Sequence, residues 1–160
     1  MFEEYNIRRF TEGDLGGVYD LIHGTIDICY DGFYSGRAIG YFRGFHSHEG
    51  ILKRGKNDDV VVMENDGEII ATGALVGNEI CGVFIRVDLQ GQGLGRLVMG
   101  KLEGIACDKG IEEVVLNVSL PSRKFYEKMG YEIYEDCQMD VGAGEILDYW
   151  KARKRLLIES

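Results

Sequence analysis

The residues with the clearest chemical potential form a glycine-rich run at positions 90–95, which reads Gln-Gly-Gln-Gly-Leu-Gly. An apolar run at positions 80–85 precedes it and is typical of a buried strand. Apolar residues at helical spacing follow from Leu94, and Lys109-Gly110 supplies a helix stop. Glycines between a strand and a helix let backbone N–H groups approach a ligand, and the helix dipole favours an anion there. The run therefore predicts a phosphate-binding loop.

Two familiar phosphate-binding motifs do not fit this run. A dinucleotide-binding fingerprint needs a third glycine where the sequence has Arg96 or Val98, depending on the starting glycine. A P-loop would start at Gly95 and reach Lys101, but Leu102 then occupies the position of the magnesium-binding hydroxyl. Nucleotide hydrolysis is therefore disfavoured.

A third pattern, Q/R-x-x-G-x-G/A, does fit positions 90–95, and by it the sequence resembles the GNAT superfamily of N-acetyltransferases. A second block at positions 114–131 ends in Phe-Tyr-Glu-Lys-Met-Gly-Tyr and resembles the strand, short helix and closing motif of that superfamily. Together the two blocks and their spacer cover about a third of the chain. It implies that acetyl-CoA is the acetyl-donating co-substrate and that the loop binds its pyrophosphate.

The resemblance also implies which residues contact the coenzyme. The end of the strand before the loop would pair its backbone with the pantetheine amides, as an added strand would. The loop and Arg96 would hold the pyrophosphate, although Arg96 also fits a plain helix-surface position. The superfamily often has arginine at the position of Gln90 and asparagine at that of Ser119, and the residues found here keep hydrogen-bonding groups. The predicted contacts are Val83, Phe84, Ile85, Gln90, Gly91, Gln92, Gly93, Leu94, Gly95, Arg96, Ser119, Ser122 and Lys124.

Acetyl transfer to an amine asks for few protein groups, because the thioester is already activated. The amine must lose a proton, and the departing thiolate must be protonated or stabilised. By resemblance, Tyr126 aligns with a tyrosine near the coenzyme sulfur and is predicted to be the general acid, since a phenol is protonated at neutral pH. Many superfamily members carry an acidic residue at the position of Glu79, the start of the strand that feeds the loop. This strand is expected to splay from its neighbour near the ligand. By resemblance, Glu79 at the mouth of the splayed strand is predicted to be the base or to orient a water. A packed helical tyrosine and a solvated strand-end glutamate are the plain alternatives.

The elements around these residues predict an α/β (α+β) fold with a GNAT-like mixed, mostly antiparallel central sheet and helices on both faces. Asp66-Gly67 between two β-rich runs is a strong hairpin signal, and Thr11 with Asp14 is typical of a helix start. Strands are expected at 6–10, 60–63, 69–76, 79–87, 113–118, 131–137 and 145–153, with helices after Thr11, after Gly93 and before Gly130.

The secondary structure of segment 23–57 is the hardest to predict from the sequence. The segment is rich in glycine and aromatic residues, with a helix expected at about 36–45. Its aromatic residues fit either core filling or a wall of the acceptor pocket, where the superfamily usually builds its acceptor site. His46 and His48 would share a face on a strand but not in the helix expected here, so we predict no metal site.

Bulk properties limit the classes of function. A chain of 160 residues fits a single domain over 1–160, and no apolar run approaches the length that spans a membrane. The formal charge of −9 argues against a nucleic-acid partner and mildly favours cationic ligands. The four cysteines are widely separated, so we expect free thiols in a reducing cytoplasm, with Cys81 and Cys107 buried.

These observations predict an acetyl-CoA-dependent N-acetyltransferase whose acceptor, a small-molecule or peptide amine, attacks the thioester directly in a ternary complex. The alternative is a non-catalytic, regulatory module that binds coenzyme A. The sequence leaves the acceptor open among a protein amine, a polyamine, an amino acid and an aminoglycoside. A homodimer through exposed edge strands is also compatible with this class of sheet.

Overall fold

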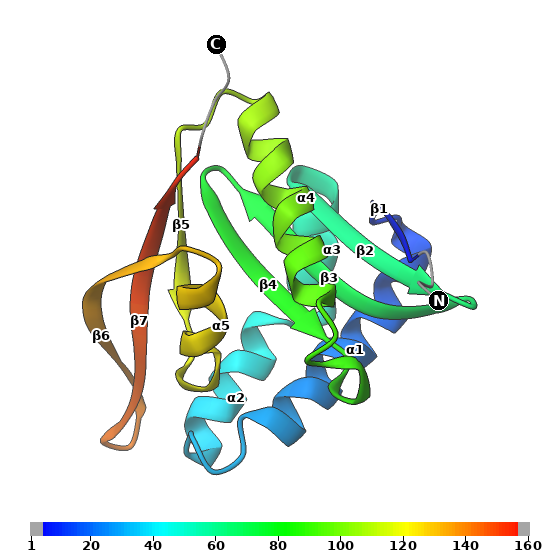
Figure 1. Ribbon diagram of the computed structural model, residues 1–160. Coiled ribbons are helices and arrows are strands. Elements are labelled where there is room, and N and C mark those ends of the chain that lie inside the picture. The colour runs from blue at the N-terminus through cyan, green and yellow to red at the C-terminus, as the bar shows by residue number, and fades with distance from the viewer. Residues whose placement is uncertain (1–4, 157–160) are drawn as a thin grey trace.

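The computed structural model describes residues 5–156, which form one seven-stranded sheet with helices packed on both of its faces (Figure 1). The strands follow the spatial order β1-β2-β3-β4-β5-β7-β6, and all neighbours except β4 and β5 are antiparallel. The predicted mixed, mostly antiparallel α/β fold is therefore confirmed. The strands are β1 (Asn6–Arg9), β2 (Asp59–Asn65), β3 (Glu68–Val76), β4 (Glu79–Ile85), β5 (Glu113–Val118), β6 (Glu132–Gly142) and β7 (Glu145–Arg155). The helices are α1 (Leu15–Cys29), α2 (Gly36–Phe45), α3 (His48–Asn57), α4 (Leu94–Asp108) and α5 (Arg123–Lys128), with short 3-10 turns η1 (Glu12–Asp14), η2 (Val87–Leu89) and η3 (Leu120–Ser122).

Side-chain alternation along the central strands sorts the helices into two layers. Val61 and Met63 of β2 are buried with the apolar side of α4, whereas Val62 between them is buried with residues of α1 and α3. This is the period of a strand that is covered on both faces. Figure 1 shows the same arrangement, with α4 in front of the sheet and α1 behind it.

The predicted hairpin between β2 and β3 is confirmed. Asp66 and Gly67 have φ angles of 52° and 79°, which is the left-handed region that a two-residue hairpin turn requires. The predicted helix start is also confirmed in part, because Thr11 and Asp14 form a capping box. They cap η1, however, and α1 follows directly from it.

The parallel pair β4 and β5 separates almost as soon as it forms. Within residues 5–156, Glu79 and Val115 are the only registered pair between these strands. Further along β4, Gly82 has a φ of 62° and lies in a bulge where the register with β3 shifts. A bulge bends its strand, so β4 turns away from β5 and leaves a gap between their carboxyl ends (Figure 1).

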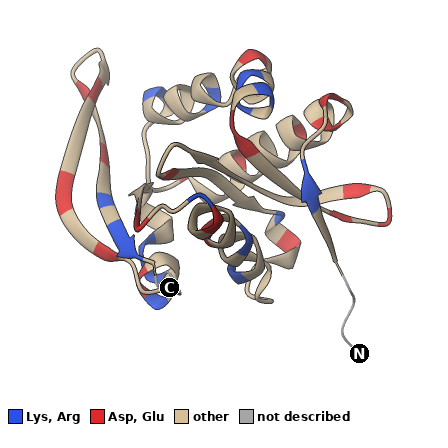
Figure 2. Ribbon diagram, turned by 90° about the horizontal axis from the view of Figure 1, so that it is seen from above, with Lys and Arg blue, Asp and Glu red and all other residues tan. Residues whose placement is uncertain are grey.

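The β6–β7 hairpin is longer than predicted and forms one edge of the sheet (Figure 2), where α2 packs against it. β6 continues to Gly142 because the reversal of the chain is confined to residues 142–144, all with positive φ. β7 begins directly after this turn and continues to Arg155. Oppositely charged side chains face each other across it, with 3.6 Å between Lys151 Nζ and Glu135 Oε2.

The segment 23–57 contains one helix that was predicted and one that was missed. The bounds of α2 match the expected 36–45, but α3 was not predicted. The expectation that His46 and His48 belong to one helix is wrong. A new helix starts between them because the Ser47 hydroxyl accepts a hydrogen bond from Gly50 N at 3.1 Å, which leaves His46 as the buried cap of α2 and His48 exposed at the start of α3.

All four cysteines are free, as expected. Cys81 and Cys107 are half-buried, so the expectation that these two thiols are buried is met only in part. Within residues 5–156, no helix combines the length and apolar character needed to cross a membrane.

Candidate active site

Two cavities meet in the gap between β4 and β5. The larger, here called the loop cavity, has a volume of about 500 Å³ and extends along the glycine-rich run and the start of α4. The smaller, here called the aromatic cavity, has a volume of about 150 Å³ and lies between α2, β4, β5 and the β6–β7 hairpin. Both cavities are lined by Tyr30, Val83, Phe84, Ser122 and Tyr126.

The loop cavity is built from the glycines that the sequence singled out. Gly91 and Gly93 have φ angles of 80° and 86°, and Gly93 precedes the first turn of α4. The first backbone N–H groups of a helix have no partner within the helix, so the start of α4 can offer donors to an anion. Gln90 Nε2 donates to Ile85 O at 3.0 Å and so ties the loop to the end of β4.

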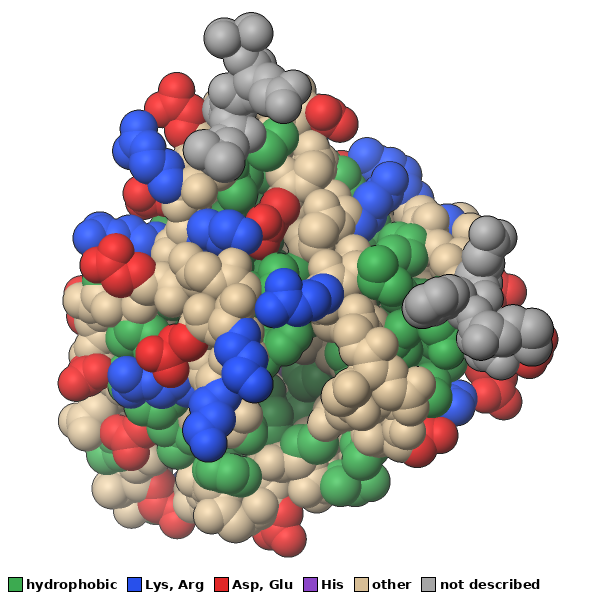
Figure 3. Space-filling view, in the orientation of Figure 1, with side chains coloured by type: hydrophobic (Ala, Val, Ile, Leu, Met, Phe, Trp, Pro, Cys, Tyr) green, Lys and Arg blue, Asp and Glu red, His purple; other side chains and the backbone are tan. Residues whose placement is uncertain are grey.

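The loop cavity is lined by positive charge, although the whole chain carries a formal charge of −9. Arg96 and Lys128 belong to its lining, and no acidic residue of the described chain does. Figure 3 shows basic side chains beside a hollow on the face that carries α4 and α5. The cavity therefore suits an anionic ligand.

Close packing between α4 and α5 positions Tyr126. A Cβ added at Gly95 would lie 2.8 Å from two carbons of the Phe125 ring, so only glycine allows this approach. Phe125 in turn meets Tyr126 edge to face, with ring centroids 5.0 Å apart. The loop residue and the phenol are thus coupled through one aromatic ring.

Tyr126 is buried where the two cavities join. Burial raises the pKa of its phenol well above the ordinary value, and nearby Tyr30 and Cys81 act in the same direction. The hydroxyl therefore keeps its proton at neutral pH and is suited to donate a hydrogen bond or a proton.

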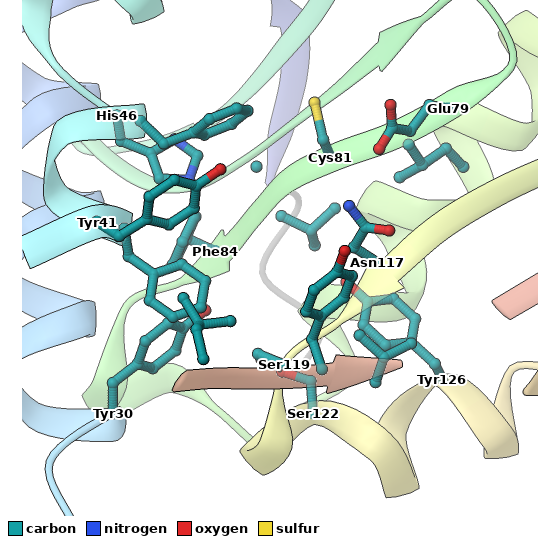
Figure 4. A pocket seen from close by; sticks show the side chains of 18 of the residues that line it. Tyr30, Tyr41, His46, Glu79, Cys81, Phe84, Asn117, Ser119, Ser122 and Tyr126 are labelled. Carbon is teal, nitrogen blue, oxygen red and sulfur yellow. Dashed lines mark hydrogen bonds between the residues drawn. The ribbon is translucent and has the colours of Figure 1, made fainter. Parts of the chain in front are cut away.

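Glu79 lines the aromatic cavity on the same side as Asn117 (Figure 4). The sequence placed this carboxylate at the mouth of a splayed strand. That placement is wrong, because Glu79 is the residue through which β4 still pairs with β5. It lies at the closed end of the gap, and the strands open towards Val83 and Ile85.

A pair of residues that the sequence did not identify closes another side of the aromatic cavity. Arg54 Nη2 lies 3.0 Å from Nδ1 of His46, which lines the cavity. A guanidinium can only donate, so Nδ1 accepts and the ring proton is on Nε2. Burial, followed by the charge of Arg54, lowers the pKa of His46 to about 3, and the imidazole is neutral. The two residues are eight positions apart, one as the cap of α2 and the other within α3, so no local spacing rule points to their contact.

Hydroxyl groups connect the gap to the surrounding elements. Ser119 Oγ and Ser122 Oγ lie 2.7 Å apart, and Tyr34 Oη accepts from Leu120 N at 2.8 Å and donates to Asp148 O at 3.1 Å. Tyr34 thereby holds the α1–α2 connection against β7 and η3. This role was not predicted, because it depends on contacts between residues more than eighty positions apart.

Most of the predicted site residues gather around the two cavities. Ser119 and Glu79 line the aromatic cavity, whereas Gln92 and Lys124 are exposed and line neither. Within residues 5–156, no group of three histidine, cysteine or acidic side chains could hold a metal ion. The remaining predicted residues line the loop cavity: Val83, Phe84, Ile85, Gln90, Gly91, Gly93, Leu94, Gly95, Arg96, Ser122 and Tyr126.

Comparison with known families decides the identity of this arrangement. The model of the acetyltransferase (GNAT) domain matches residues 31–143, which is well over half of the chain. The chain belongs to the GNAT acetyltransferase family. This membership supports acetyltransferase activity, and the predicted resemblance is confirmed.

Solved GNAT structures share the fold at low sequence identity. The GCN5-related N-acetyltransferase from Rhodopseudomonas palustris superposes with a TM-score of 0.88 at 17% identity and covers 98% of both chains. The PaiA N-acetyltransferase from Thermoplasma acidophilum, in complex with coenzyme A, gives 0.78 at 22% identity, covering 96% of this chain and 100% of its own. The phosphinothricin acetyltransferase from Sinorhizobium meliloti, in complex with acetyl-CoA, gives 0.71 at 16% identity, covering 96% and 89%. At these identities the likeness establishes the fold alone.

Proposed function

We propose that the protein is an acetyl-CoA-dependent N-acetyltransferase that acetylates a primary amine by direct attack in a ternary complex. One observation carries the proposal: a buried, protonated phenol lies where a phosphate-suited cavity meets a second, separate cavity. The donor would enter through the loop cavity and the acceptor through the aromatic cavity. Their reacting groups would then meet beside Tyr126.

The loop cavity has the groups that acetyl-CoA requires. Arg96 and the N–H groups at the start of α4 are suited to the pyrophosphate. The edge of β4 beyond Glu79 has no registered partner in β5 among the described residues, so its backbone can pair with the pantetheine amides. The fold likeness to GNAT structures that hold coenzyme A or acetyl-CoA supports this interpretation.

The chemical step follows from these positions. The ammonium form of the acceptor gives one proton to Glu79, directly or through water, and the freed nitrogen lone pair attacks the thioester carbon. The tetrahedral intermediate collapses, the C–S bond breaks, and Tyr126 gives its proton to the leaving thiolate. Amide and coenzyme A thiol are the products. As the amide forms, its nitrogen loses a second proton, and this proton restores the phenol through solvent. Glu79 releases the first proton to solvent, so each turnover with an ammonium acceptor releases one proton.

Direct attack is favoured over an acetyl-cysteine intermediate. Cys81 is the cysteine that lines the aromatic cavity, and burial raises the pKa of its thiol to about 11. A thiol that stays protonated is a poor nucleophile. Intact mass after incubation with acetyl-CoA alone should show no added acetyl group, and a stoichiometric adduct on Cys81 would contradict direct attack.

The proposal is tested by calorimetric titration with acetyl-CoA, followed by a thiol-release screen across amines. We expect saturable binding and amine-dependent release of coenzyme A. Binding without release for any amine would favour the non-catalytic coenzyme A-binding module instead. An absence of binding would contradict the assignment of the loop cavity.

A further inference from the structure

We propose that the acceptor is a small primary amine with a single positive charge and one aromatic or similarly flat apolar body. The carboxylate of Glu79 would receive the ammonium group, and the rings of the aromatic cavity would hold the body. This inference rests on the proposed acetyl transfer and specifies its acceptor.

Aromatic rings dominate the lining of the aromatic cavity, and they come from five different elements or their ends. They hold one another in place, with Tyr30 and Phe42 edge to face at 4.8 Å and His46 and Phe84 edge to face at 5.2 Å. Such a wall is organised before a ligand arrives and offers faces and edges to another ring. The rings of the lining are Tyr30, Tyr41, Phe42, Phe45, His46, Phe84, Tyr126 and Tyr149.

Two of these rings remain open to solvent. Tyr41 and Phe45 of α2 are 40% and 50% exposed although they line the cavity. Exposed aromatic surface beside a cavity marks a place where an apolar ligand gains free energy by covering it. A ring bound in the cavity would shield both side chains from water.

The charges of the lining fit one cation and no anion. Glu79 is the only acidic residue in the lining, and no lysine or arginine of the described chain belongs to it. Arg54 is not part of the lining. It donates to His46, and burial, followed by the charge of Arg54, keeps that imidazole neutral. An acceptor with a carboxylate would therefore find no cation in the lining, and a polyamine would bring charges without partners.

The shape of the cavity agrees with these charges. Glu79 and Asn117 lie on one side, and Tyr30, Tyr41 and His46 lie across from them (Figure 4). A volume of about 150 Å³ is comparable to a cavity that holds one benzene ring. A single ring with a short aminoalkyl arm therefore fits both the volume and the polarity of the cavity.

The first test measures kcat/KM by thiol release with phenethylamine, benzylamine, spermidine, L-lysine and an unblocked tripeptide. We expect an aromatic monoamine to exceed spermidine, lysine and the tripeptide at least tenfold. A preference for any of these three would overturn the acceptor class while leaving acetyl transfer intact. Failure of every amine despite acetyl-CoA binding would instead overturn the transfer itself, and the acceptor class with it.

The second test uses a matched pair of half-exposed phenylalanines. Phe45 lines the aromatic cavity, whereas Phe33 is 53% exposed and lines neither cavity. We expect Phe45→Ala to raise KM for phenethylamine about tenfold and Phe33→Ala to leave it unchanged. KM for acetyl-CoA should stay unchanged in both variants.

A second pair of tyrosines, one in the cavity and one outside it, checks that the effect of Phe45→Ala on KM is not caused by a disturbance elsewhere in the fold. Tyr41 lines the cavity, and Tyr134 of β6 is 42% exposed and lines neither cavity. Tyr41→Ala should raise the same KM, and Tyr134→Ala should not. Equal effects within both pairs would contradict the proposed wall.

Discussion

At the scale of single residues, Tyr126 is the side chain whose replacement should reduce catalysis most. Replacing it with phenylalanine removes the proton donor but keeps the ring that packs between Phe125 and Tyr131. General acid catalysis contributes about 10²–10⁴-fold, so we expect Tyr126→Phe to lower kcat at least about a hundredfold. The dissociation constant for acetyl-CoA, measured by calorimetry, should change less than about threefold.

Tyr134→Phe is the control for this variant, because Tyr134 is exposed on β6 with Arg153 over its ring at 4.9 Å. It should retain full kcat. An undiminished kcat in Tyr126→Phe would make Tyr126 a packing residue, which is the plain alternative that its helical position allows.

His46 gives a prediction about stability against pH. Its pKa in the folded protein is about 3, below the ordinary value of 6.5, so the unfolded chain binds more protons between these values. The stability that neutral His46 contributes is present above pH 6.5 and is lost as the pH falls towards 3. The loss approaches about 1.4 kcal/mol per pH unit below 6.5.

This contribution is measured by urea unfolding at pH 7.5 and pH 5.0. His46→Gln should flatten the decline of unfolding free energy between these values. His48→Gln, which changes an exposed histidine stacked on Tyr19 at 3.8 Å, should retain the decline of the unmodified protein. Equal slopes in all three proteins would show that His46 is already able to protonate in the folded state.

At the scale of elements, the contact between α4 and α5 is a close fit that one methyl group would disturb. Gly95 faces the rigid Phe125 ring, whereas a Cβ at Gly100 in the same helix would meet nothing within 4 Å. We expect Gly95→Ala to lower the free energy of unfolding by about 1–3 kcal/mol through overpacking and to weaken acetyl-CoA binding.

Gly100→Ala is the matched control for α4. It should raise the free energy of unfolding by about 0.5–1 kcal/mol, since alanine is the better helix former. Urea unfolding and calorimetric titration measure both effects. The same sign of stability change in the two variants would contradict the proposed role of the α4–α5 contact.

Elements with a local signal could be predicted from the sequence. The strand, loop and α4 follow from glycines beside a helical apolar period, and the β2–β3 hairpin follows from Asp66-Gly67. Many residues around the loop cavity belong to the unit formed by β4, the glycine-rich loop and α4, so the sequence could predict them.

Other features depend on contacts that no local pattern contains. The boundary between α2 and α3 depends on a single serine cap in a glycine-rich stretch, where helix propensity is low. Glu79 lies where β4 still pairs with β5, because the bulge at Gly82 that bends β4 away from β5 comes only further along the strand. The acceptor side is therefore less predictable than the coenzyme side, because residues 30–54, β4, β5 and the β6–β7 hairpin must meet to form it.

At the scale of the whole molecule, the weak point of the sheet lies beside the candidate active site. β1 to β4 form one antiparallel group and β5, β7 and β6 another, and within the described residues 5–156 a single registered pair joins them. Helix α4 and the buried cluster around it contact strands of both groups. We propose that this shared core makes residues 1–160 one cooperative domain, and that a ligand lying between β4 and β5 joins the two groups more firmly.

Trp150, the only tryptophan of the chain, reports on this coupling from the second group of strands. It pairs with Val118 of β5, and Arg123 lies over its ring at 4.8 Å, so its fluorescence follows the packing around β7. Far-UV circular dichroism at 222 nm follows the helices, which pack mainly on the first group. A single domain unfolds with the same midpoint by both probes.

Thermal unfolding with both probes, without and with acetyl-CoA at about 100 times its dissociation constant, tests the coupling. The ligand should stabilise the folded state by about 2.7 kcal/mol and raise the common Tm by about 5–10 °C. Because the ligand would lie between the two groups of strands, both probes should shift equally. A lower midpoint for Trp150, or a ligand shift confined to one probe, would mean that the β5–β7–β6 group unfolds separately and that the gap is a true boundary within the fold.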